Sequence, residues 1–535
     1  MSGSNEDPRL RLLGNQKAGD PTGAAGGETS TSPVLRRLDE TRVVVEVAPD
    51  ADDAARVAVA AFVTMVARLV PDVVVNSTQE LPANWWQANS WADLLDRLAP
   101  VRPQSGVPAV RDIVVGFGVL VPGCDIYVGG GDWNVVLADS PLTLEVGNNH
   151  GLGLQAAACL AVSQVLVKAL GDLGFPGVEV SGTIETNLID HGLHQIEEQI
   201  LTPGTPLEVA RLGILGVGSV GTSTLALLAT ASSPVLNTTS SVAPLLAAAL
   251  NLTAVDRDAF DPDRNPYRYP ALLGGETGKK ASEMADRMGK FGLRAEASDT
   301  DVATWNTTKA EPGWHGVLVS SVDTLTGRLD VADVLGERTL SAGVSGTELH
   351  VQWEGFADGY ACPFCDFVRA DPPLTQAGVY MQVTGIPVSR VLALLQDGAL
   401  LGADDVDIAI GAGRVPAHRR DAFVGAPLSD LIRQAYAEAE MRPQGDRHAT
   451  AHSDVIAVAS PQVSWFAGTL VAAELVKHML GLPTLNRRVD LDVAGLPAGV
   501  VRSAPADPTG TCVCYSGVRR RWYRSLYDQL QGAGA

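Results

Sequence analysis

The feature that most constrains the fold is a short apolar segment that runs into a glycine-rich turn. Leu212 to Leu215 is typical of a buried strand, Gly216-x-Gly218-x-x-Gly221 follows, and a helical pattern continues to Ala231. Glycine lets the backbone approach a phosphate closely, and the N-terminus of the following helix offers unpaired N–H groups. Strand, turn and helix in this order predict a nucleotide site, with a glycine packing turn as the alternative. The turn alone does not say which nucleotide binds.

This turn lies in a long stretch without charge. From Leu212 to Val255 there is no Asp, Glu, Lys or Arg, and a membrane span needs about 20 predominantly apolar residues. The stretch is broken by Pro234, Pro244 and many small polar residues. A buried strand, helix and strand therefore explain it better than a membrane span.

The first acid after the turn is Asp256, which lies 35 residues beyond Gly221. A dinucleotide fingerprint places its acidic ribose ligand about 20 residues on. An inserted surface loop from Ser232 to Pro244 would account for the difference, and the strand ending at Asp256 can still be the next one in the sheet. Asp256 can then hold the ribose of a dinucleotide or of a mononucleotide.

Further polar and charged residues follow in an order that suits a triphosphate. Cations near a carboxylate ribose ligand can neutralise charge developing on an α-phosphate and on a leaving pyrophosphate. An acid after the strand Val317 to Ser320 would point into the crevice where ligands of open α/β sheets bind, and there it can hold Mg²⁺. Solvated surface charge is the alternative for any single residue, and no hydride-site pattern favours a nicotinamide-dependent oxidoreductase. The series comprises Asp256, Asp258, Asn265, Arg268, Lys280 and Asp323.

Four of the six cysteines occur as two close pairs, Cys362 with Cys365 and Cys512 with Cys514. Six cysteines in a chain of 535 residues cannot form a disulfide scaffold. Four thiolates suit a closed tetrahedral Zn²⁺ site in which the second pair holds the C-terminal segment against the body. A redox dithiol is the alternative for the first pair.

Composition limits the partners. The chain has 40 Lys and Arg against 61 Asp and Glu, for a net charge of −21. Such a surface repels nucleic acids and anionic lipids, so neither is expected as a partner. No apolar signal segment follows Met1, and the expected location is a reducing cytoplasm.

Taken in order, the glycine turn, the charged series and the two cysteine pairs resemble the ThiF/MoeB-type adenylating family, which is related to the ubiquitin-activating enzymes. The resemblance covers roughly residues 195–515. It implies that a C-terminal carboxylate attacks the α-phosphate of ATP to give an acyl-adenylate and pyrophosphate. The carboxylate would belong to a small ubiquitin-like or sulfur-carrier protein or to a peptide. A nucleotide-binding scaffold without catalysis is the rival class.

The resemblance also implies a role for each residue of the series. Nucleotide binding would fall to Gly216, Gly218, Gly221, Asp256, Asp258 and Asn265, with Asp256 on the ribose and Asn265 on the phosphates. Arg268 and Lys280 would contact the phosphates during catalysis, and Asp323 would bind Mg²⁺. The four paired cysteines, Cys362, Cys365, Cys512 and Cys514, would bind zinc.

The sequence departs from the family pattern in two places. The family carries Arg-x-x-Arg-Gln before its first strand, whereas residues 194–201 here contain no arginine. Thioester-forming members place a cysteine between the two zinc pairs, and none lies between Cys365 and Cys512. The adenylate would therefore pass directly to an outside nucleophile unless Cys124 or Cys159 reaches it. Cys159 lies in an Ala-rich helix and is expected in the core, so Cys124 is the better thiol candidate.

We expect an α/β protein with a Rossmann-like adenylation domain, built on a mainly parallel sheet, at residues 196–515. Residues 1–38 are expected to be a disordered tail and residues 516–535 a C-terminal tail. Residues 39–195 would form a degenerate adenylation-like half or a docking domain, since Gly116-Phe117-Gly118 follows a strand but lacks a third glycine. Similar Ala-rich helical patterns at 151–168 and 464–477 suggest duplication, with shared composition as the alternative. The protein would act as a homodimer or as a pseudo-symmetric pair of halves.

Overall fold

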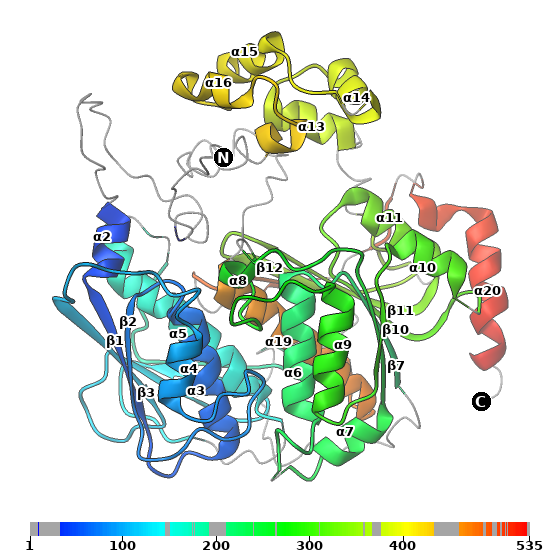
Figure 1. Ribbon diagram of the computed structural model, residues 1–535. Coiled ribbons are helices and arrows are strands. Elements are labelled where there is room, and N and C mark those ends of the chain that lie inside the picture. Colours follow the sequence, from blue (N-terminus) through cyan, green and yellow to red (C-terminus); the bar gives the residue numbers. More distant parts are fainter. Residues whose placement is uncertain are drawn as a thin grey trace.

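The computed structural model shows a mixed α/β protein with two mainly parallel sheets, as expected (Figure 1). We refer to residues 33–191 as the first half and to residues 210–531 as the second half. The structure describes residues 9, 33–144, 150–173, 175, 177–191, 210–238, 240–262, 265–309, 311–356, 359–365, 376–397, 399–432, 460–484, 488–494, 500–502, 505–508, 510 and 512–531.

The first half forms a six-stranded sheet in the order β2-β1-β3-β4-β5-β6. Strands β2, β1, β3 and β4 are parallel, whereas β5 and β6 pair antiparallel. Alternating burial along the Val-rich β1 is typical of a strand with one face on the core. The elements are α2 (Pro33–Asp39), β1 (Thr41–Val47), α3 (Asp53–Val66), β2 (Asp72–Asn76), α4 (Trp91–Arg97), β3 (Arg111–Phe117), β4 (Ile126–Gly130), β5 (Asn134–Ala138), α5 (Leu152–Leu170) and β6 (Thr183–Asn187).

The second half forms an eight-stranded sheet in the order β14-β13-β12-β11-β10-β7-β8-β9. Strands β9, β8, β7, β10 and β11 are parallel, and β12, β13 and β14 continue antiparallel. The elements are β7 (Ala210–Leu215), α6 (Ser219–Ser232), α7 (Ala243–Ala249), β8 (Leu250–Val255), α8 (Asn265–Arg268), α9 (Lys280–Lys290), β9 (Ala295–Ser298), α10 (Val302–Thr308), β10 (Trp314–Ser320), α11 (Leu325–Val334), β11 (Gly336–Ser345), β12 (Glu348–Glu354), α19 (Pro461–Met479), β13 (Arg488–Asp492), β14 (Val500–Arg502) and α20 (Gly517–Gln531).

The two halves share one topology. The strands β2-β1-β3-β4-β5-β6 have the same order and relative directions as β8-β7-β10-β11-β12-β13. Helix α3 follows β1 as α6 follows β7, and α5 precedes β6 as α19 precedes β13. The likeness between the two Ala-rich helices therefore extends to their places in the fold, and both have 19 residues.

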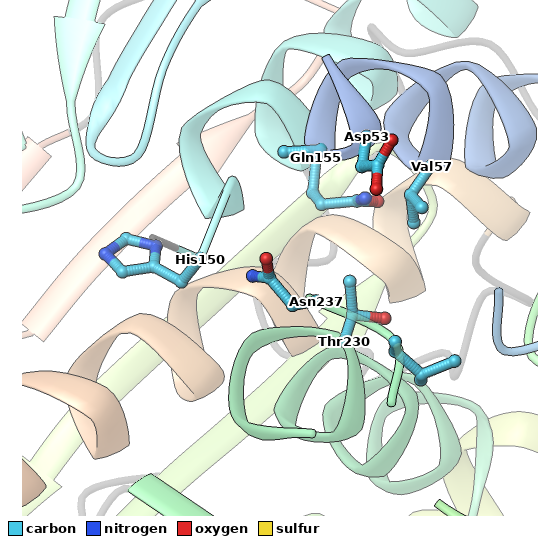
Figure 2. Close-up of a pocket in the computed structure, with 8 residues that line it drawn as sticks. Asp53, Val57, His150, Gln155, Thr230 and Asn237 are labelled. Atoms are coloured by element: carbon cyan, nitrogen blue, oxygen red, sulfur yellow. The ribbon is translucent and has the colours of Figure 1, made fainter. Parts of the chain in front are cut away.

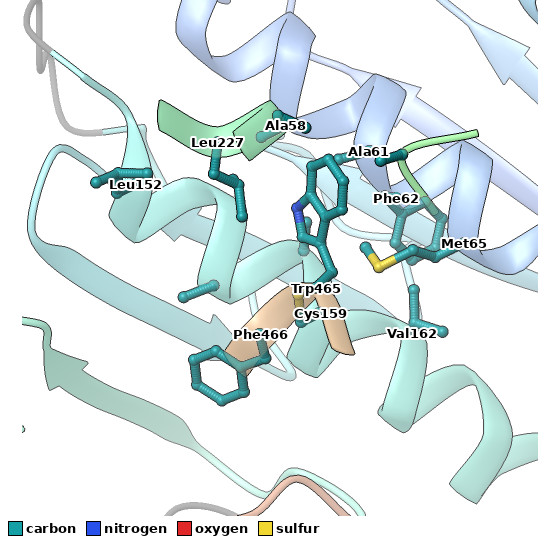
Figure 3. Close-up of a cluster of buried hydrophobic side chains, with 14 of the residues drawn as sticks. Ala58, Ala61, Phe62, Met65, Leu152, Cys159, Val162, Leu227, Trp465 and Phe466 are labelled. Atoms are coloured by element: carbon teal, nitrogen blue, oxygen red, sulfur yellow. The ribbon is translucent and has the colours of Figure 1, made fainter. Parts of the chain in front are cut away.

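Buried helices join the halves. Helix α5 packs on α3, α19 packs on α6, and α5 and α19 pack on each other. Figure 3 shows Trp465 of α19 in a cluster formed by side chains from α3, α5 and α6. Its indole nitrogen donates to Gln155 of α5 at 3.0 Å. One continuous hydrophobic cluster thus includes residues of both halves.

The uncharged stretch from Leu212 to Val255 is divided among β7, α6, α7 and β8, which confirms the strand, helix and strand expectation. Among the described residues, Leu152–Leu173 is the one helical segment long and apolar enough to cross a membrane. However, 94% of its most apolar window is buried inside the protein. This segment is accordingly the central core helix of the first half.

A helical segment between β12 and α19 has its own hydrophobic cluster, which includes Ile386, Val391 and Leu431. It comprises α13 (Gln376–Thr384), α14 (Val388–Asp397), α15 (Ala403–Gly411) and α16 (Arg420–Phe423), drawn in yellow tones in Figure 1. At the C-terminus, α20 docks on the second sheet because the Tyr527 hydroxyl accepts from the Trp314 amide at 2.9 Å. The segment expected as a C-terminal tail therefore includes a helix that contacts the sheet.

Candidate functional site

The candidate site lies where the strand order of the second sheet changes direction. From β7 the chain continues to β8 and β9 on one side and then returns to β10 on the other side of β7. Open α/β sheets bind ligands in the crevice at the carboxyl ends of the strands at such a switch point. Here the loop after β10 touches the glycine turn, since the Ser321 amide donates to Leu215 O at 3.0 Å and its hydroxyl to Gly216 O at 2.5 Å.

The three glycines of the turn have different environments. Gly216 has a φ of +91°, which favours glycine. A Cβ on Gly221 would lie 2.2 Å from the carbonyl oxygen of Gly216, so this position also needs glycine. A Cβ on Gly218 would meet only the Tyr269 hydroxyl, at 4.0 Å. The backbone at Gly218 therefore faces open space over the turn.

The N-terminus of α6 is available to an anion. Gly218 is its N-cap, and no side chain within the described residues accepts a hydrogen bond from the first turn there. Unpaired N–H groups and the positive end of the helix dipole favour a negatively charged ligand at this position. The turn thus has the geometry that a phosphate requires.

Asp256 connects the end of β8 to the turn. Its carboxylate accepts from the Val217 amide at 2.7 Å and from the Asp258 amide at 2.8 Å. Burial raises the pKa of Asp256, and the positive charge of Lys280 opposes this effect. Two carboxylate oxygens offer about four acceptor sites, so two remain for ligand hydroxyls.

Lys280 brings a cation to the same place. It is the first residue of α9, is buried, and its Nζ lies 3.4 Å from Oδ2 of Asp258. Burial alone would lower the pKa of Lys280, but the Tyr269 hydroxyl and the neighbouring acids outweigh burial and raise it. The side chain therefore keeps its charge at neutral pH.

Arg268 is the last residue of α8, and the next residue, Tyr269, places its hydroxyl 4.0 Å from the position of a Cβ on Gly218. The Nε of Arg268 is buried and has no hydrogen-bond partner among the described residues, so its N–H can donate to an anionic ligand. The Tyr269 side chain is buried near the charges of Lys280, Arg268, Asp256 and Asp323, and its burial raises its pKa. The sequence did not indicate Tyr269, because only the fold brings its hydroxyl over Gly218.

The remaining residues of the charged series follow strands at the same carboxyl edge of the second sheet. Asp323 is exposed in the loop after β10, close enough to Tyr269 for their charges to interact. Asp258 is also exposed and contacts Lys280, and Asn265 begins α8. The structure therefore brings Asp256, Asp258, Lys280 and Asp323 close to the turn or to Tyr269. Residues 194–201, where the family pattern has its arginine, lie outside the described part of the chain.

The first half lacks this site at the corresponding position. The N-terminus of α3 is capped by its own Asp52, which accepts from the Ala55 amide at 2.8 Å, and Asp53 lies in the first turn. Two carboxylates repel a phosphate where α6 has glycine. Gly116-Phe117-Gly118 lies at the end of β3, from which the chain continues to β4 rather than to a helix.

The four paired cysteines meet in one buried cluster. Their sulfur atoms all lie within 4.8 Å of one another. The Cys362–Cys512 and Cys365–Cys514 sulfur pairs are 3.5 Å apart. Four sulfurs bound to one Zn²⁺ at about 2.3 Å lie roughly 3.8 Å apart. Both the donor set and the spacing fit a structural zinc ion, and the short Cys-x-Cys spacing does not prevent the tetrahedral arrangement.

The surroundings of the cluster also suit thiolates. The amide of Cys362 donates to the sulfur of Cys365 at 3.4 Å, as does the amide of Asp507. Hydrogen bonds from the other thiols lower the pKa of Cys365, whereas the shared proton raises the pKa of Cys362. A divalent cation bound to the four sulfur atoms would favour the thiolate form of each cysteine. The site would join the loop after β12 to the segment before α20.

The two other cysteines lie in the first half. Cys159 is fully buried in α5, as expected for a core residue, and burial raises its pKa. Cys124 is half-buried in the loop before β4, where burial also raises its pKa. Neither thiol is activated as a nucleophile.

A small cavity between the halves is separate from this site. Figure 2 shows Asp53 and Val57 of α3 with Gln155 of α5 and Thr230 of α6 around it. The space that it offers to the centre of a water molecule is only about 10 Å³, which is about enough for one water. Thr230 lies near the C-terminal end of α6, at the opposite end from the glycine turn. The cavity therefore cannot serve a phosphate bound at Gly218.

The fold and site define an α/β protein whose glycine turn, acids and cations meet at the carboxyl edge of a parallel sheet. No family model matches the chain. The uncharacterized protein y4jF of Sinorhizobium fredii is 27% identical over 499 residues, spanning 88% of this chain and 89% of that protein.

Two solved structures of E. coli MccB are also similar. MccB with AMPCPP and selenomethionine MccA is 13% identical, with a TM-score of 0.32 over 58% of this chain and 67% of that chain. MccB alone is 14% identical, with a TM-score of 0.33 over 58% of this chain and 65% of that chain. Similarity at this level does not define a function.

Proposed function

We propose that this protein is an adenylyltransferase that activates the C-terminal carboxylate of a small ubiquitin-like or sulfur-carrier protein or of a peptide. The observation that carries the proposal is the uncapped glycine turn, over which the Tyr269 hydroxyl lies, together with the buried and unpartnered Nε of the adjacent Arg268. Lys280 and Asp256 lie at the same edge. An anionic ligand that also carries hydroxyls fits this combination, and ATP is such a ligand.

Each residue of the site has a place in the binding of ATP. The amides at Gly218 and the start of α6 bind phosphate oxygens, and Asp256 accepts hydrogen bonds from the ribose hydroxyls. Arg268 and Lys280 lie beside the phosphates as cations. Asp323 offers an exposed carboxylate, which fits the usual binding of Mg²⁺ by one or two carboxylates plus substrate phosphates. When bound there, Mg²⁺ would neutralise part of the negative charge on the phosphates.

In the reaction, a carboxylate oxygen attacks the α-phosphorus and forms a new P–O bond. The bond from the α-phosphorus to the bridging oxygen breaks, and the electron pair leaves with pyrophosphate. No proton is transferred in this step. Arg268 and Lys280 stabilise the negative charge that develops on the leaving group, because fixed cations in a partly buried site need no reorganisation.

The acyl-adenylate then passes directly to an outside nucleophile, which displaces AMP. This second step needs no thiol of this chain, because four cysteines form the buried cluster and the pKa values of the other two are raised. The cluster contributes zinc-dependent stability rather than chemistry. Free thiols and a structural zinc are consistent with a reducing cytoplasm, which we propose as the location.

The test is exchange of labelled pyrophosphate into ATP, with peptides and Gly-Gly-ending carrier proteins as probes. Asp323→Ala should abolish exchange, whereas Asp421→Ala, which removes a fully exposed carboxylate elsewhere, should leave it unchanged. Unchanged exchange in Asp323→Ala would remove that residue from the mechanism. Binding of Mg-ATP without exchange for any probe would favour the scaffold, which the missing family arginine also favours.

A further inference from the structure

Side chains of the first half donate hydrogen bonds to four consecutive backbone carbonyl groups of the second half, those of residues 269–272. Trp86 donates its indole N–H to Pro270 O at 2.9 Å, and Trp85 donates to Ala271 O at 2.9 Å. Arg68 donates to Tyr269 O at 3.2 Å and also to Leu272 O. We call these three donors and their acceptors the carbonyl clamp.

All three donors are deeply buried. Arg68 and Trp85 have no exposed surface, and Trp86 is 3% exposed. A buried donor that loses its acceptor costs its desolvation free energy. The clamp therefore holds the segment 269–272 in one position relative to the first half.

The clamped residues directly follow Arg268. Tyr269 provides one of the four carbonyls, and the hydroxyl of the same residue lies over Gly218. Residues further along are held as well, since the space beside Gly274 is filled by Pro100 and Val101 of the first half. A shift of the segment would move the Tyr269 hydroxyl away from Gly218 and would displace the adjacent Arg268 with it.

We propose that the first half positions the nucleotide site of the second half, and that Arg68, Trp85 and Trp86 are positioning residues for Arg268 and Tyr269. The inference rests on the proposed function, because it takes the glycine turn as the phosphate site. It assigns the first half a role although its own helix α3 begins with two acids in place of a glycine turn. This positioning of the site does not require any arginine of the first half to contact the nucleotide.

The test compares Trp85→Phe and Trp86→Phe with Trp91→Phe in the full-length protein. Each change keeps an aromatic ring and removes one indole N–H. Trp91 is a matched control, because its N–H donates at 3.0 Å to Gln79 O within the first half. Two measurements are made: the Kd for Mg-ATP, and hydrogen exchange of residues 269–276.

In both clamp variants the Kd for Mg-ATP should rise roughly three- to tenfold, the range expected for one lost hydrogen bond. Exchange should accelerate at Leu272 and Gly274, whose amides donate to Tyr269 O and to the Glu276 carboxylate. Trp91→Phe should change neither quantity. If Trp85 and Trp86 only stabilised the fold, their Phe variants would have a lower melting temperature, but their Kd for Mg-ATP would not exceed that of Trp91→Phe.

Wild-type exchange rates at residues 269–276 in both clamp variants would overturn the inference, and so would equal effects in Trp91→Phe. Failure of the proposed function has a different signature, because the wild-type protein would then not bind Mg-ATP. In that case the exchange rates alone decide whether the clamp holds the segment.

Discussion

Gly218→Ala should separate nucleotide binding from stability. At this position φ is −77° and ψ is −159°, so alanine fits the backbone without strain. Loss of the glycine N-cap costs about 0.5–1 kcal/mol, and the lower entropy of the unfolded chain offsets about 0.4–1 kcal/mol. The two effects nearly cancel, and the melting temperature should stay close to that of the wild type.

The added methyl group would occupy the space between the turn and the Tyr269 hydroxyl, 4.0 Å away. A phosphate oxygen could then no longer approach the α6 N-terminus. We expect the Kd for Mg-ATP, measured by titration calorimetry, to rise at least about tenfold, which corresponds to about 1.4 kcal/mol.

Two glycine variants serve as controls for this prediction. Gly289→Ala lies in α9, where a Cβ would meet nothing within 4 Å, and it should bind Mg-ATP like the wild type. Gly221→Ala places a methyl 2.2 Å from a backbone oxygen and should destabilise the protein by about 1–3 kcal/mol. A folded Gly218→Ala protein with the wild-type Kd would show that no phosphate lies over the turn.

Three further predictions concern the metal, the thiols and pH. Metal analysis should find about one zinc per chain, and Cys362→Ser should lower the melting temperature more than Cys124→Ser; a folded, metal-free wild-type protein of equal stability would contradict the zinc site. After incubation with Mg-ATP and a carrier, a non-reducing gel should show no adduct, whereas a thiol-sensitive adduct that is absent in Cys124→Ala would disprove direct transfer. Burial and then Arg338 lower the pKa of His478 to about 4, whereas the unfolded chain takes up that proton near pH 6.5. Stability should therefore fall as the pH drops from about 6.5 towards 4, and urea unfolding should show a smaller fall in His478→Gln; an equal fall in both proteins would exclude this contribution.

Much of the site could be predicted from the sequence because its parts are local. A strand, a glycine turn and a helix are consecutive along the chain, so the sequence alone indicates Gly216, Gly218 and Gly221. An acid directly after a predicted strand, such as Asp256, could be placed at the carboxyl edge by the same reasoning. The observed β7, α6 and β8 confirm this local prediction.

Other features of the site depend on contacts between segments that are distant in the chain. Local sequence patterns do not predict such contacts. Tyr269 directly follows a predicted site residue, yet its importance depends on where Gly218 lies. Arg68 and Trp86 precede the segment that they hold by 201 and 184 residues. No periodicity or spacing indicates such a pairing.

The sequence by itself determined the α/β class, the glycine turn and the cysteine pairs, because each depends on residues that are close neighbours in the chain. Only the tertiary structure decided that Cys362 and Cys512 lie 3.5 Å apart across 150 residues. It alone showed that the halves share one strand order and that buried donors of the first half hold the loop beside Arg268. The physical reason is that buried donors, acceptors and thiols must find partners wherever the fold places them, and those partners are fixed by packing rather than by sequence distance.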